Sequence, residues 1–315
     1  MFEEIKKEYE ASLDKIEYRR NILKEIMQIR DIKCLLKNSI IKEIGINNDC
    51  AFITLKEEFD NIKLHINELD FEEVPISILC FGDYERSETN MVLKLLDFYK
   101  QDDDFTCLDI GANVGWYTLN ILKRFKNANV FSFEPSPITV NRLKQNLKLN
   151  NFSDNKVFNI GFFNKNDKLD FYYDEEGSGA SSLVDLRERD SVKKISVYME
   201  RLDDWVKEND IKRVDFIKCD VEGAEYFVYQ GGIKTIQENK PIVFSEMLRK
   251  WSAKFGYHPN NIISFFKDMG YKCYIIHKNE FLKELEVVDE NTVETNYYFL
   301  HKDKHRSLIE KLTNS

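Results

Sequence analysis

The order of apolar and polar residues divides the chain into three regions. From Phe2 to about Ile44, apolar residues recur at spacings of three and four, which predicts one long or two shorter amphipathic helices. From Ala51 to Phe81, the short apolar runs AFITL, IKLHI and PISILCF are separated by charged turns, which predicts a small β-rich adapter. After Phe105, short β-branched or aromatic runs alternate with helical patterns, as in a parallel sheet covered by helices on both faces.

We therefore expect two parts: an extension over residues 1–80 with helices and a β-hairpin, and a doubly wound α/β domain over residues 81–315. The helical stripe of the extension either packs on the protein's own body or forms a homo-oligomeric seam, because charged residues flank it. LDDWVKEND and NNIISFFKDMG are predicted helices of the α/β domain. Its predicted strands are FTCLDI, NVFSF, KVFNI, LDFYY, ISVYM, VDFIKCD, PIVFSEM, YKCYIIH and NYYFLH.

Composition narrows the class of protein. The chain has 315 residues, and its formal net charge of -9 opposes binding to nucleic-acid phosphates. The 6 cysteines form no C-x-x-C pair, and Cys107 and Cys219 lie in apolar runs, which favours a reducing cytoplasm. The N-terminus lacks the apolar core of a signal peptide, and no run of about 20 apolar residues occurs. We therefore expect neither secretion nor a membrane span.

The segment DIGANVG joins a predicted strand to a predicted helix, which is where doubly wound sheets bind ligands. Gly111 permits a turn that a side chain would forbid, and Gly115 lets the helix start close to a ligand. The G-x-x-x-G spacing differs from the dinucleotide fingerprint G-x-G-x-x-G, so pyrophosphate is a poorer fit. Glu134 ends the next strand, where a carboxylate can accept hydrogen bonds from both ribose hydroxyls.

Further motifs make the chain resemble a known family. LDIGANVGWYTL, FEPSP, LKQNLKLNN, LDDW, VDFIKCDVEGAEYFVYQGG and PIVFSEM occur in the order seen in FkbM-type methyltransferases, a branch of the class I enzymes that use S-adenosylmethionine. The resemblance runs from about Phe81 to His301. It implies a Rossmann-like sheet of seven strands, mostly parallel with the last antiparallel, and a cofactor lying across the carboxyl ends of the first two strands.

The resemblance also implies roles for individual residues. The loop expected to hold the methionine part of the cofactor carries Asp109, Gly111, Asn113 and Gly115, and Glu134 matches the ribose acid. The adenine is expected near Asn159 and Ile160, which end KVFNI, by position alone. In YERSETN, Tyr84 or Glu85 is expected either to touch the cofactor or to cap the following helix.

Transfer of a methyl group to a hydroxyl needs a base or a metal ion that draws off its proton. Asp220, at the end of VDFIKCD, is the first candidate for this base. Lys218 lies on the same strand face, where an ammonium group needs either a structural carboxylate partner or an active-site role. Glu222 follows in the next loop, and His258 is a further candidate base unless it is simply solvated.

Three carboxylates are predicted to meet at the rim of the sheet. Asp220, Glu222 and Glu246 could bind Mg²⁺ or Mn²⁺ through hard oxygen ligands, or serve as helix caps. The loop DEEGSGASSLVD, with Ser181 and Ser182, is predicted either to cover the acceptor as a lid or to form a plain hairpin turn.

The expected function is S-adenosylmethionine-dependent O-methylation of a sugar hydroxyl, in a nucleotide-linked sugar or a surface polysaccharide precursor. The substrate class comes from the resemblance alone. Trp251, Phe255 and Tyr257 suit stacking on a sugar ring, or belong to the core. The alternatives are methylation of a small non-sugar metabolite or an N-acceptor, and a non-catalytic nucleotide-binding scaffold that keeps the fold.

Overall fold

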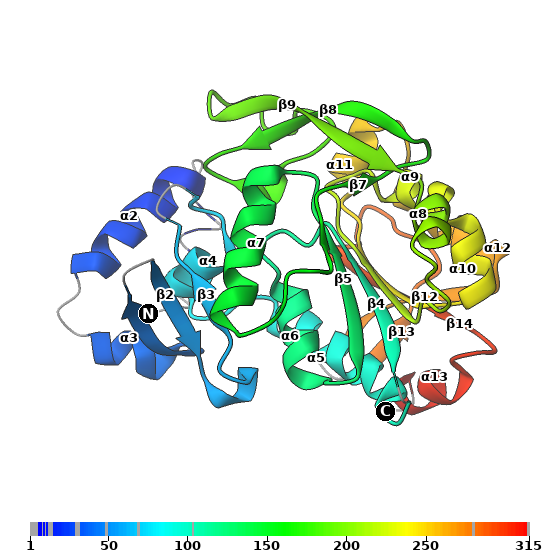
Figure 1. Ribbon diagram of the computed structural model, residues 1–315, viewed down its shortest axis with the longest axis horizontal. Helices are drawn as coiled ribbons and strands as arrows, with labels where there is room; N and C mark the ends of the chain where they lie inside the picture. The colour runs from blue at the N-terminus through cyan, green and yellow to red at the C-terminus, as the bar shows by residue number, and fades with distance from the viewer. Residues whose placement is uncertain are drawn as a thin grey trace.

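The structure is a computed structural model that describes residues 6, 7, 9, 11, 15–28, 32–47, 50–67, 70–102, 104–278 and 281–313. A large sheet with helices on both faces lies beside a smaller N-terminal unit, and a third sheet crosses the upper end of the large one (Figure 1). No described helix has both the length and the apolar character needed to cross a membrane.

The large sheet has the order β13-β12-β14-β11-β10-β4-β5-β6. Strands β6, β5, β4, β10 and β11 are parallel, and β14 runs antiparallel between β11 and β12. This confirms the doubly wound, mostly parallel class I arrangement, to which β13 adds an eighth strand at one edge. The strand bounds are β4 Phe105–Ile110, β5 Ala128–Phe133, β6 Val157–Phe158, β10 Phe216–Cys219, β11 Ile242–Glu246, β12 Tyr271–His277, β13 Phe281–Glu284 and β14 Asn296–His301.

Alternation along the strands divides the core into two layers. On β10, Phe216 packs into one layer while Ile217 and Cys219 pack into the other, as the period of two requires. The first layer includes α5 (Arg86–Leu96), α6 (Trp116–Arg124), α7 (Pro137–Leu149) and α13 (Arg306–Thr313). The second includes α8 (Leu202–Glu208), α9 (Glu225–Gly231), α10 (Ile233–Asn239) and α12 (Pro259–Asp268), and the short helix α11 spans Arg249–Lys254.

The third sheet has the order β7-β9-β8 and its own small core. Its strands are β7 Gly161–Phe162, β8 Asp167–Asp174 and β9 Val192–Glu200, and the short helix η3 (Ser178–Ala180) lies between β8 and β9. The loop that joins β8 to β9 contains the predicted lid, DEEGSGASSLVD, which spans residues 174–185; below, we call residues 174–189 the lid. Its position over the strand ends depends on this sheet.

The N-terminal unit consists of α2 (Lys15–Gln28), α3 (Ile32–Asn38), a β1-β2-β3 sheet and α4 (Val74–Phe81). Its strands are β1 Ile41–Ile46, β2 Ala51–Leu55 and β3 Lys63–His65, and the antiparallel pair of β2 and β3, from the runs AFITL and IKLHI, forms the predicted hairpin. Two predictions are wrong here: PISILCF is helix α4 rather than a strand, and the helical stripe ends before β1. The five described cysteines are free, and the side chain of Cys34 lies outside the description.

Asn146 of α7 and Asn150, which caps the C-terminus of that helix, bind the outer strand of the N-terminal sheet. The amide of Asn150 accepts from the backbone N–H of Lys63 at 2.9 Å and donates to its carbonyl at 2.7 Å. Asn146 accepts from the N–H of His65 at 2.7 Å and donates to the carbonyl of Val114 in the loop after β4 at 2.8 Å. One hydrophobic core runs from Ile22 to the large sheet, so the division at residue 80, which stays a prediction, crosses a shared core.

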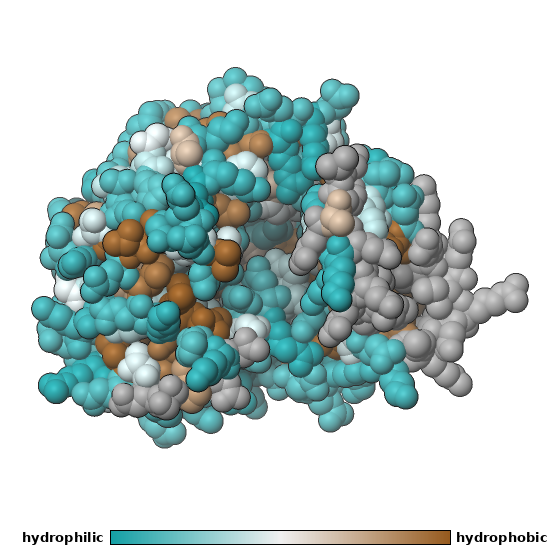
Figure 2. Space-filling view, turned by 180° about the vertical axis from the view of Figure 1, so that it is seen from behind, coloured by the Kyte–Doolittle hydropathy of each residue, from teal (hydrophilic) through white to brown (hydrophobic). Residues whose placement is uncertain are grey.

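Seen from behind, the surface carries a patch of apolar residues within a polar surround (Figure 2). The exposed large hydrophobic residues among those described are Ile46, Phe98, Ile138, Tyr198, Val287 and Val293.

Candidate functional site

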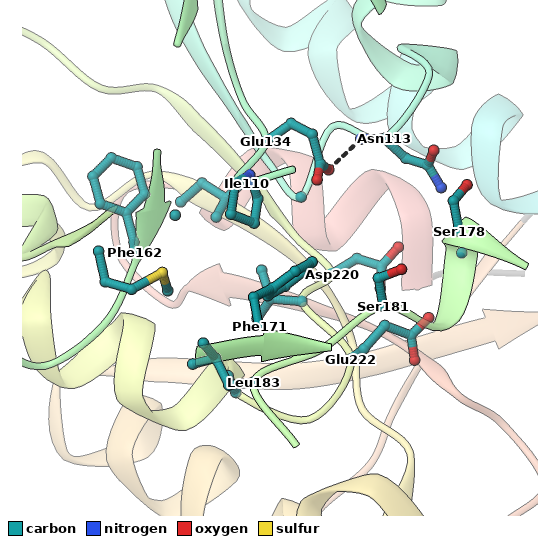
Figure 3. A pocket seen from close by; sticks show the side chains of 17 residues that line it. Ile110, Asn113, Glu134, Phe162, Phe171, Ser178, Ser181, Leu183, Asp220 and Glu222 are labelled. Atoms are coloured by element: carbon teal, nitrogen blue, oxygen red, sulfur yellow. Dashed lines mark hydrogen bonds between the residues drawn. The ribbon is translucent and has the colours of Figure 1, made fainter. Parts of the chain in front are cut away.

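A cleft lies at the carboxyl ends of β4, β5 and β10, beneath the third sheet and the lid (Figure 3). Parallel strands end together at this edge, so residues far apart in sequence meet there. The cleft is lined by Ile110, Gly111, Asn113, Glu134, Pro135, Gly161, Phe162, Phe171, Ser178, Gly179, Ser181, Leu183, Met199, Asp220, Val221, Glu222 and Ala224.

The glycine loop after β4 has the close-packed geometry that its sequence predicts. Gly111 has a φ of 72°, and a Cβ there would lie 1.8 Å from the carbonyl oxygen of Asp220. Gly115 has a φ of 92°, and a Cβ would lie 2.3 Å from Cδ1 of Leu143. Between them Asn113 adopts a φ of 46°, a left-handed conformation uncommon outside glycine. A residue with a Cβ therefore does not fit at either glycine position without a shift of its neighbours.

Asp109 faces inward and anchors the loop rather than opening into the cleft. It is 1% exposed, and its Oδ2 accepts hydrogen bonds from the backbone N–H of Thr118 at 3.0 Å and from its hydroxyl at 2.5 Å. These bonds hold the first turn of α6, where carboxylates are favoured by the helix dipole. Asp109 Oδ1 lies 3.8 Å from the Lys218 ammonium group. Asp109 is not among the residues that line the cleft. It therefore supports the predicted cofactor loop from behind.

Glu134 presents a carboxylate to the cleft from the end of β5. Its Oε2 accepts from the backbone N–H of Asn113 at 3.1 Å (Figure 3). Its Oε1 accepts from the backbone N–H of Ser136 at 3.0 Å. Burial raises the pKa of Glu134 to about 7, although these two backbone donors oppose the shift. Each oxygen keeps a lone pair for a ligand, which is the arrangement that bidentate recognition of two vicinal hydroxyls requires.

An apolar wall faces Glu134 across the cleft and was not predicted. It is formed by residues of β7, β8, β9 and the lid: Phe162, Phe171, Leu183 and Met199. The predicted adenine residues lie just outside it. Asn159 donates to the carbonyls of Glu134 and Pro135, and Ile160 packs against the second core layer. In the sequence, Gly161 and Phe162 directly follow KVFNI, and this pair could have indicated the apolar wall.

Lys218 and Asp220 are joined by an ion pair next to the glycine loop. In the sheet register, Lys218 lies opposite Asp109 on the neighbouring strand, so the two charges must meet. The Lys218 ammonium donates to the carbonyl of Gly111 at 2.7 Å and lies 3.3 Å from Asp220 Oδ2. Burial alone would lower the pKa of Lys218, but Asp220, Asp109 and Glu85 outweigh it and raise that pKa. Lys218 therefore stays protonated and fixes the loop.

The three predicted metal-binding carboxylates do meet. Asp220, Glu222 and Glu246 offer oxygens that all lie within 4.8 Å of one another, and each residue is partly exposed. Burial and the nearby charge of Asp220 raise the pKa values of Glu222 and Glu246 well above the usual range. Glu222 has a φ of 53°, a left-handed backbone conformation that is strained for a residue other than glycine. Such a concentration of negative charge favours a cation or a proton at this point.

Tyr84 and Glu85 lie beside these carboxylates rather than along the cleft. Glu85 accepts a hydrogen bond from the Tyr117 hydroxyl at 2.7 Å, and burial raises its pKa to about 7. Burial raises the pKa of Tyr84 well above its usual value, with contributions from the charges of Glu85, Asp220 and Glu246. The structure thus brings both residues to the acidic side of the site, and neither lines the cleft.

His258 lies away from the cleft. It is exposed and begins α12, where its ring accepts from the N–H of Asn260 at 3.3 Å. The side chain of Asn261 accepts from the backbone N–H of His258 at 2.9 Å, which completes a capping box. The cap explains His258 without a catalytic role. The aromatic residues predicted to stack on a sugar also lie outside the cleft lining: Trp251, Phe255 and Tyr257.

The lid does cover the cleft. Ser178, Gly179, Ser181 and Leu183 line it, and the hydroxyl of Ser182 donates to the carbonyl of Glu222 at 2.8 Å. The Ser181 hydroxyl accepts from the backbone N–H of Asp174 at 3.1 Å, so it braces the lid. The lid therefore joins the third sheet to the acidic loop after β10.

Comparison with known proteins assigns the fold and the cleft to a family. Residues 109–273, more than half of the chain, match the family described as the methyltransferase FkbM domain. The chain therefore belongs to the FkbM methyltransferase family. The matched segment contains the glycine loop, Glu134, the lid and all three carboxylates of the acidic cluster.

Two curated relatives are similar over about half of the chain. The 2-O-methyltransferase NoeI of Sinorhizobium fredii is 31% identical over 150 residues, covering 44% of this chain and 61% of the relative. The hexuronic acid methyltransferase AglP of Haloferax volcanii is 26% identical over 157 residues, covering 48% and 59%. The chain thus spans about three fifths of the length of these relatives. A solved FkbM methyltransferase of Methylobacillus flagellatus has a TM-score of 0.40 at 17% identity, covering 74% of this chain and 55% of the other.

Proposed function

We propose that the protein transfers the methyl group of S-adenosylmethionine to a hydroxyl of a sugar. The observation that carries the proposal is the meeting of two features: the cleft is lined by the glycine loop with Glu134 and by Asp220 and Glu222, and Glu246 completes the acidic cluster beside these two carboxylates. The first suits the cofactor, and the second suits the removal of a proton from an acceptor. Membership of the FkbM methyltransferase family supports the class of reaction.

The residues of the cleft fit the cofactor. Glu134 would accept from the ribose hydroxyls, the loop from Gly111 to Gly115 would hold the amino-acid end, and the apolar wall would contact the adenine. Asn113 lines the cleft, and its buried Oδ1 has no hydrogen-bond partner within the described structure. An unpaired buried acceptor is costly, so a donor on the ligand is expected there. Bound S-adenosylmethionine supplies an electrophilic methyl group on a sulfonium.

On the acceptor side, Asp220 is the proposed base. It lines the cleft, and its side chain keeps about a third of its surface exposed, so an acceptor hydroxyl can reach it. The Lys218 ammonium lies 3.3 Å from Asp220 Oδ2 and holds this side chain from behind. A base in this position takes the proton of the hydroxyl while the lid excludes water.

A divalent cation is the second element of the proposal. Asp220, Glu222 and Glu246 supply hard oxygen donors of the kind that Mg²⁺ and Mn²⁺ prefer. A cation there would offset the repulsion that raises the pKa values of Glu222 and Glu246. These residues would hold the ion, and the ion would lower the pKa of an acceptor hydroxyl.

Sugar acceptors are favoured by the relatives. One similar protein is named a 2-O-methyltransferase and another a hexuronic acid methyltransferase. The acidic cluster adds a physical argument, because carboxylates are strong acceptors for the hydroxyl groups that crowd a sugar ring. We infer a nucleotide-linked sugar or a glycan precursor as the acceptor, with no role for nucleic acid because the chain is acidic. A cytoplasmic location and a homo-oligomer formed through the N-terminal helices stay predictions.

Two experiments test the proposal in sequence. Calorimetry with S-adenosylhomocysteine, with NAD and NADP as controls, should show binding of the first alone; no binding would contradict the proposal. A screen of nucleotide sugars with labelled S-adenosylmethionine, with Mg²⁺ or with a chelator, then identifies the acceptor and the metal requirement. Turnover of non-sugar metabolites alone would favour the alternative substrate class, and binding without any turnover would favour a scaffold.

A further inference from the structure

A short segment of the N-terminal unit grips the lid. This segment, Asp70–Glu73, lies between β3 and α4, and we call it the clamp segment. It lies outside the part of the chain that matches the FkbM family, whereas the lid lies inside that part. Backbone and side chains of the clamp segment contact both the lid and α7.

Asp70 joins three elements at one buried point. It is fully buried, and its Oδ2 accepts from the Arg142 guanidinium at 2.8 Å and from the backbone N–H of Ser178 at 3.2 Å. Ser178 lines the cleft, while Arg142 belongs to α7 and also lies 3.3 Å from Glu73. A buried carboxylate needs such partners, so the position of Ser178 is fixed by a residue about a hundred positions earlier in the chain.

Glu72 forms a two-pronged ion pair with the far side of the lid. Its Oε1 accepts from Arg187 at 2.6 Å, and its Oε2 lies 2.5 Å from the second guanidinium nitrogen. The geometry matches the fork that arginine offers to a carboxylate. The lid also packs tightly here, because a Cβ on Gly177 would lie 2.8 Å from Glu72 Oε2.

A backbone hydrogen bond and an ion pair with α2 also connect the N-terminal unit to the lid. The N–H of Phe71 donates to the carbonyl of Glu176 at 3.0 Å, and Arg20 of α2 pairs with the Glu176 side chain. Between these contacts, the Ser182 hydroxyl binds the lid to the carbonyl of Glu222. The lid is thus held by the N-terminal unit at residues 176–178 and at Arg187, and by the acidic loop at Ser182.

We propose that Asp70 and Glu72 are positioning residues, which hold the lid in its closed place over the cleft before a ligand arrives. A lid that is already ordered spares the ligand the entropy of ordering it, so affinity is higher. The inference rests on the proposed function in one respect, the identity of the ligand. Its consequence is that the N-terminal unit, though outside the family match, takes part in the site.

The test compares Glu72→Gln, Arg187→Gln and the double variant with the intact protein. Amide hydrogen exchange of residues 174–189 without ligand should be about tenfold faster in each single variant, because a charge-assisted pair is lost. The affinity for S-adenosylhomocysteine, measured by calorimetry, should fall by a similar factor of about ten. The double variant should resemble Glu72→Gln, because that single variant already removes the pair with Arg187 and also the contact of Glu72 with Arg189 at 3.9 Å. The control is Glu284→Gln on β13, which removes an exposed pair with Lys272 of β12.

The outcomes separate this proposal from the proposed function. Unchanged exchange of the lid in Glu72→Gln, or faster exchange spread equally over β10 and α8, would overturn the positioning role. So would equal affinities for S-adenosylhomocysteine in the variant and the intact protein. If the intact protein does not bind S-adenosylhomocysteine but Glu72→Gln still loosens the lid, the proposed cofactor is wrong and the grip on the lid stands.

Discussion

The two sides of the cleft are built by different means. On the side of β4 and β5, backbone geometry shapes the site: glycines with positive φ, and a carboxylate held by two main-chain N–H groups. On the side of β10 and β11, side chains shape it: an acidic cluster, a buried ammonium group and a lid held by ion pairs. Substitutions in the glycine loop or at Glu134 should therefore weaken or abolish binding, whereas substitutions in the acidic cluster should change turnover.

The largest effect is expected from Gly111→Ala. Its Cβ would overlap the backbone carbonyl of Asp220, which cannot move without shifting β10. We expect a loss of about 3 kcal/mol or more in the free energy of unfolding, and no measurable binding of S-adenosylhomocysteine. Chemical denaturation and calorimetry give the two quantities.

Gly256→Ala is the matched control for this substitution. Gly256 has a φ of 77°, but no atom lies within 4 Å of an added Cβ. It should cost only the backbone strain of about 1 kcal/mol and leave binding intact. Equal losses in the two variants would show that the contact with Asp220 is unimportant.

Asp220→Asn should separate turnover from binding. The amide cannot take a proton, so kcat should fall by about a hundredfold or more, while the affinity for S-adenosylhomocysteine changes little. Steady-state kinetics with the acceptor found by screening, beside calorimetry, make the measurement. Asp170→Asn on the exposed face of β8 is the control. Normal turnover in Asp220→Asn would remove this residue from the mechanism.

Glu134 should make cofactor binding depend on pH near neutrality. Its pKa is about 7 in the free protein, and two ribose donors need the ionised carboxylate. As the pH falls below about 7 the carboxyl gains a proton and loses acceptor capacity, so affinity for S-adenosylhomocysteine should weaken progressively. Glu134→Gln should bind about tenfold less tightly and lose this pH dependence. A variant that keeps the same pH profile would assign the titration to another group.

Mg²⁺ should stabilise the protein through the acidic cluster. The pKa of Glu246 is raised in the folded protein, so ionising this carboxyl is less favourable there than in the unfolded chain. The protein therefore loses stability as the pH rises above the pKa that Glu246 has in the unfolded chain. At neutral pH without metal, Glu246→Gln should therefore melt at a higher temperature than the intact protein. Added Mg²⁺ should raise the Tm of the intact protein and not that of the variant. Thermal melts with Mg²⁺ and with a chelator check both.

His258→Ala is expected to have the smallest effect. Loss of the helix cap should cost about 1 kcal/mol in the free energy of unfolding and leave kcat unchanged. Denaturation and turnover of the same sample check this. A large fall in kcat would return His258 to the list of catalytic residues.

The same difference between the sides explains what the sequence could predict. A backbone that needs positive φ leaves a local signature, so Gly111, Gly115 and the strand-end acid Glu134 could be identified from DIGANVG and FEPSP. The pairing of Lys218 with Asp109 also follows from strand alternation once the strand order is known. The partners Glu72 and Arg187 lie 115 positions apart, and no local pattern links them.

The wrong elements have a physical reason too. PISILCF is a short, continuous apolar run, and periodicity alone cannot distinguish a buried helix turn from a strand of this length. The proline near the start of α4 was the available signal, because proline is favoured in the first turn of a helix. In IKEIGI the isoleucines at Ile41 and Ile44 continue the helical spacing of three, although the segment forms β1.

Asn146 of α7 and the following cap residue Asn150 have a consequence for assembly. The amide of Asn150 mimics a peptide unit and, with Asn146, occupies the outer rim of β3, where an extra strand would otherwise add. A second molecule cannot extend the small sheet at this rim without displacing both amides. The two residues thereby prevent strands of other molecules from adding to the edge of β3. Self-association at the N-terminal end has to use another surface.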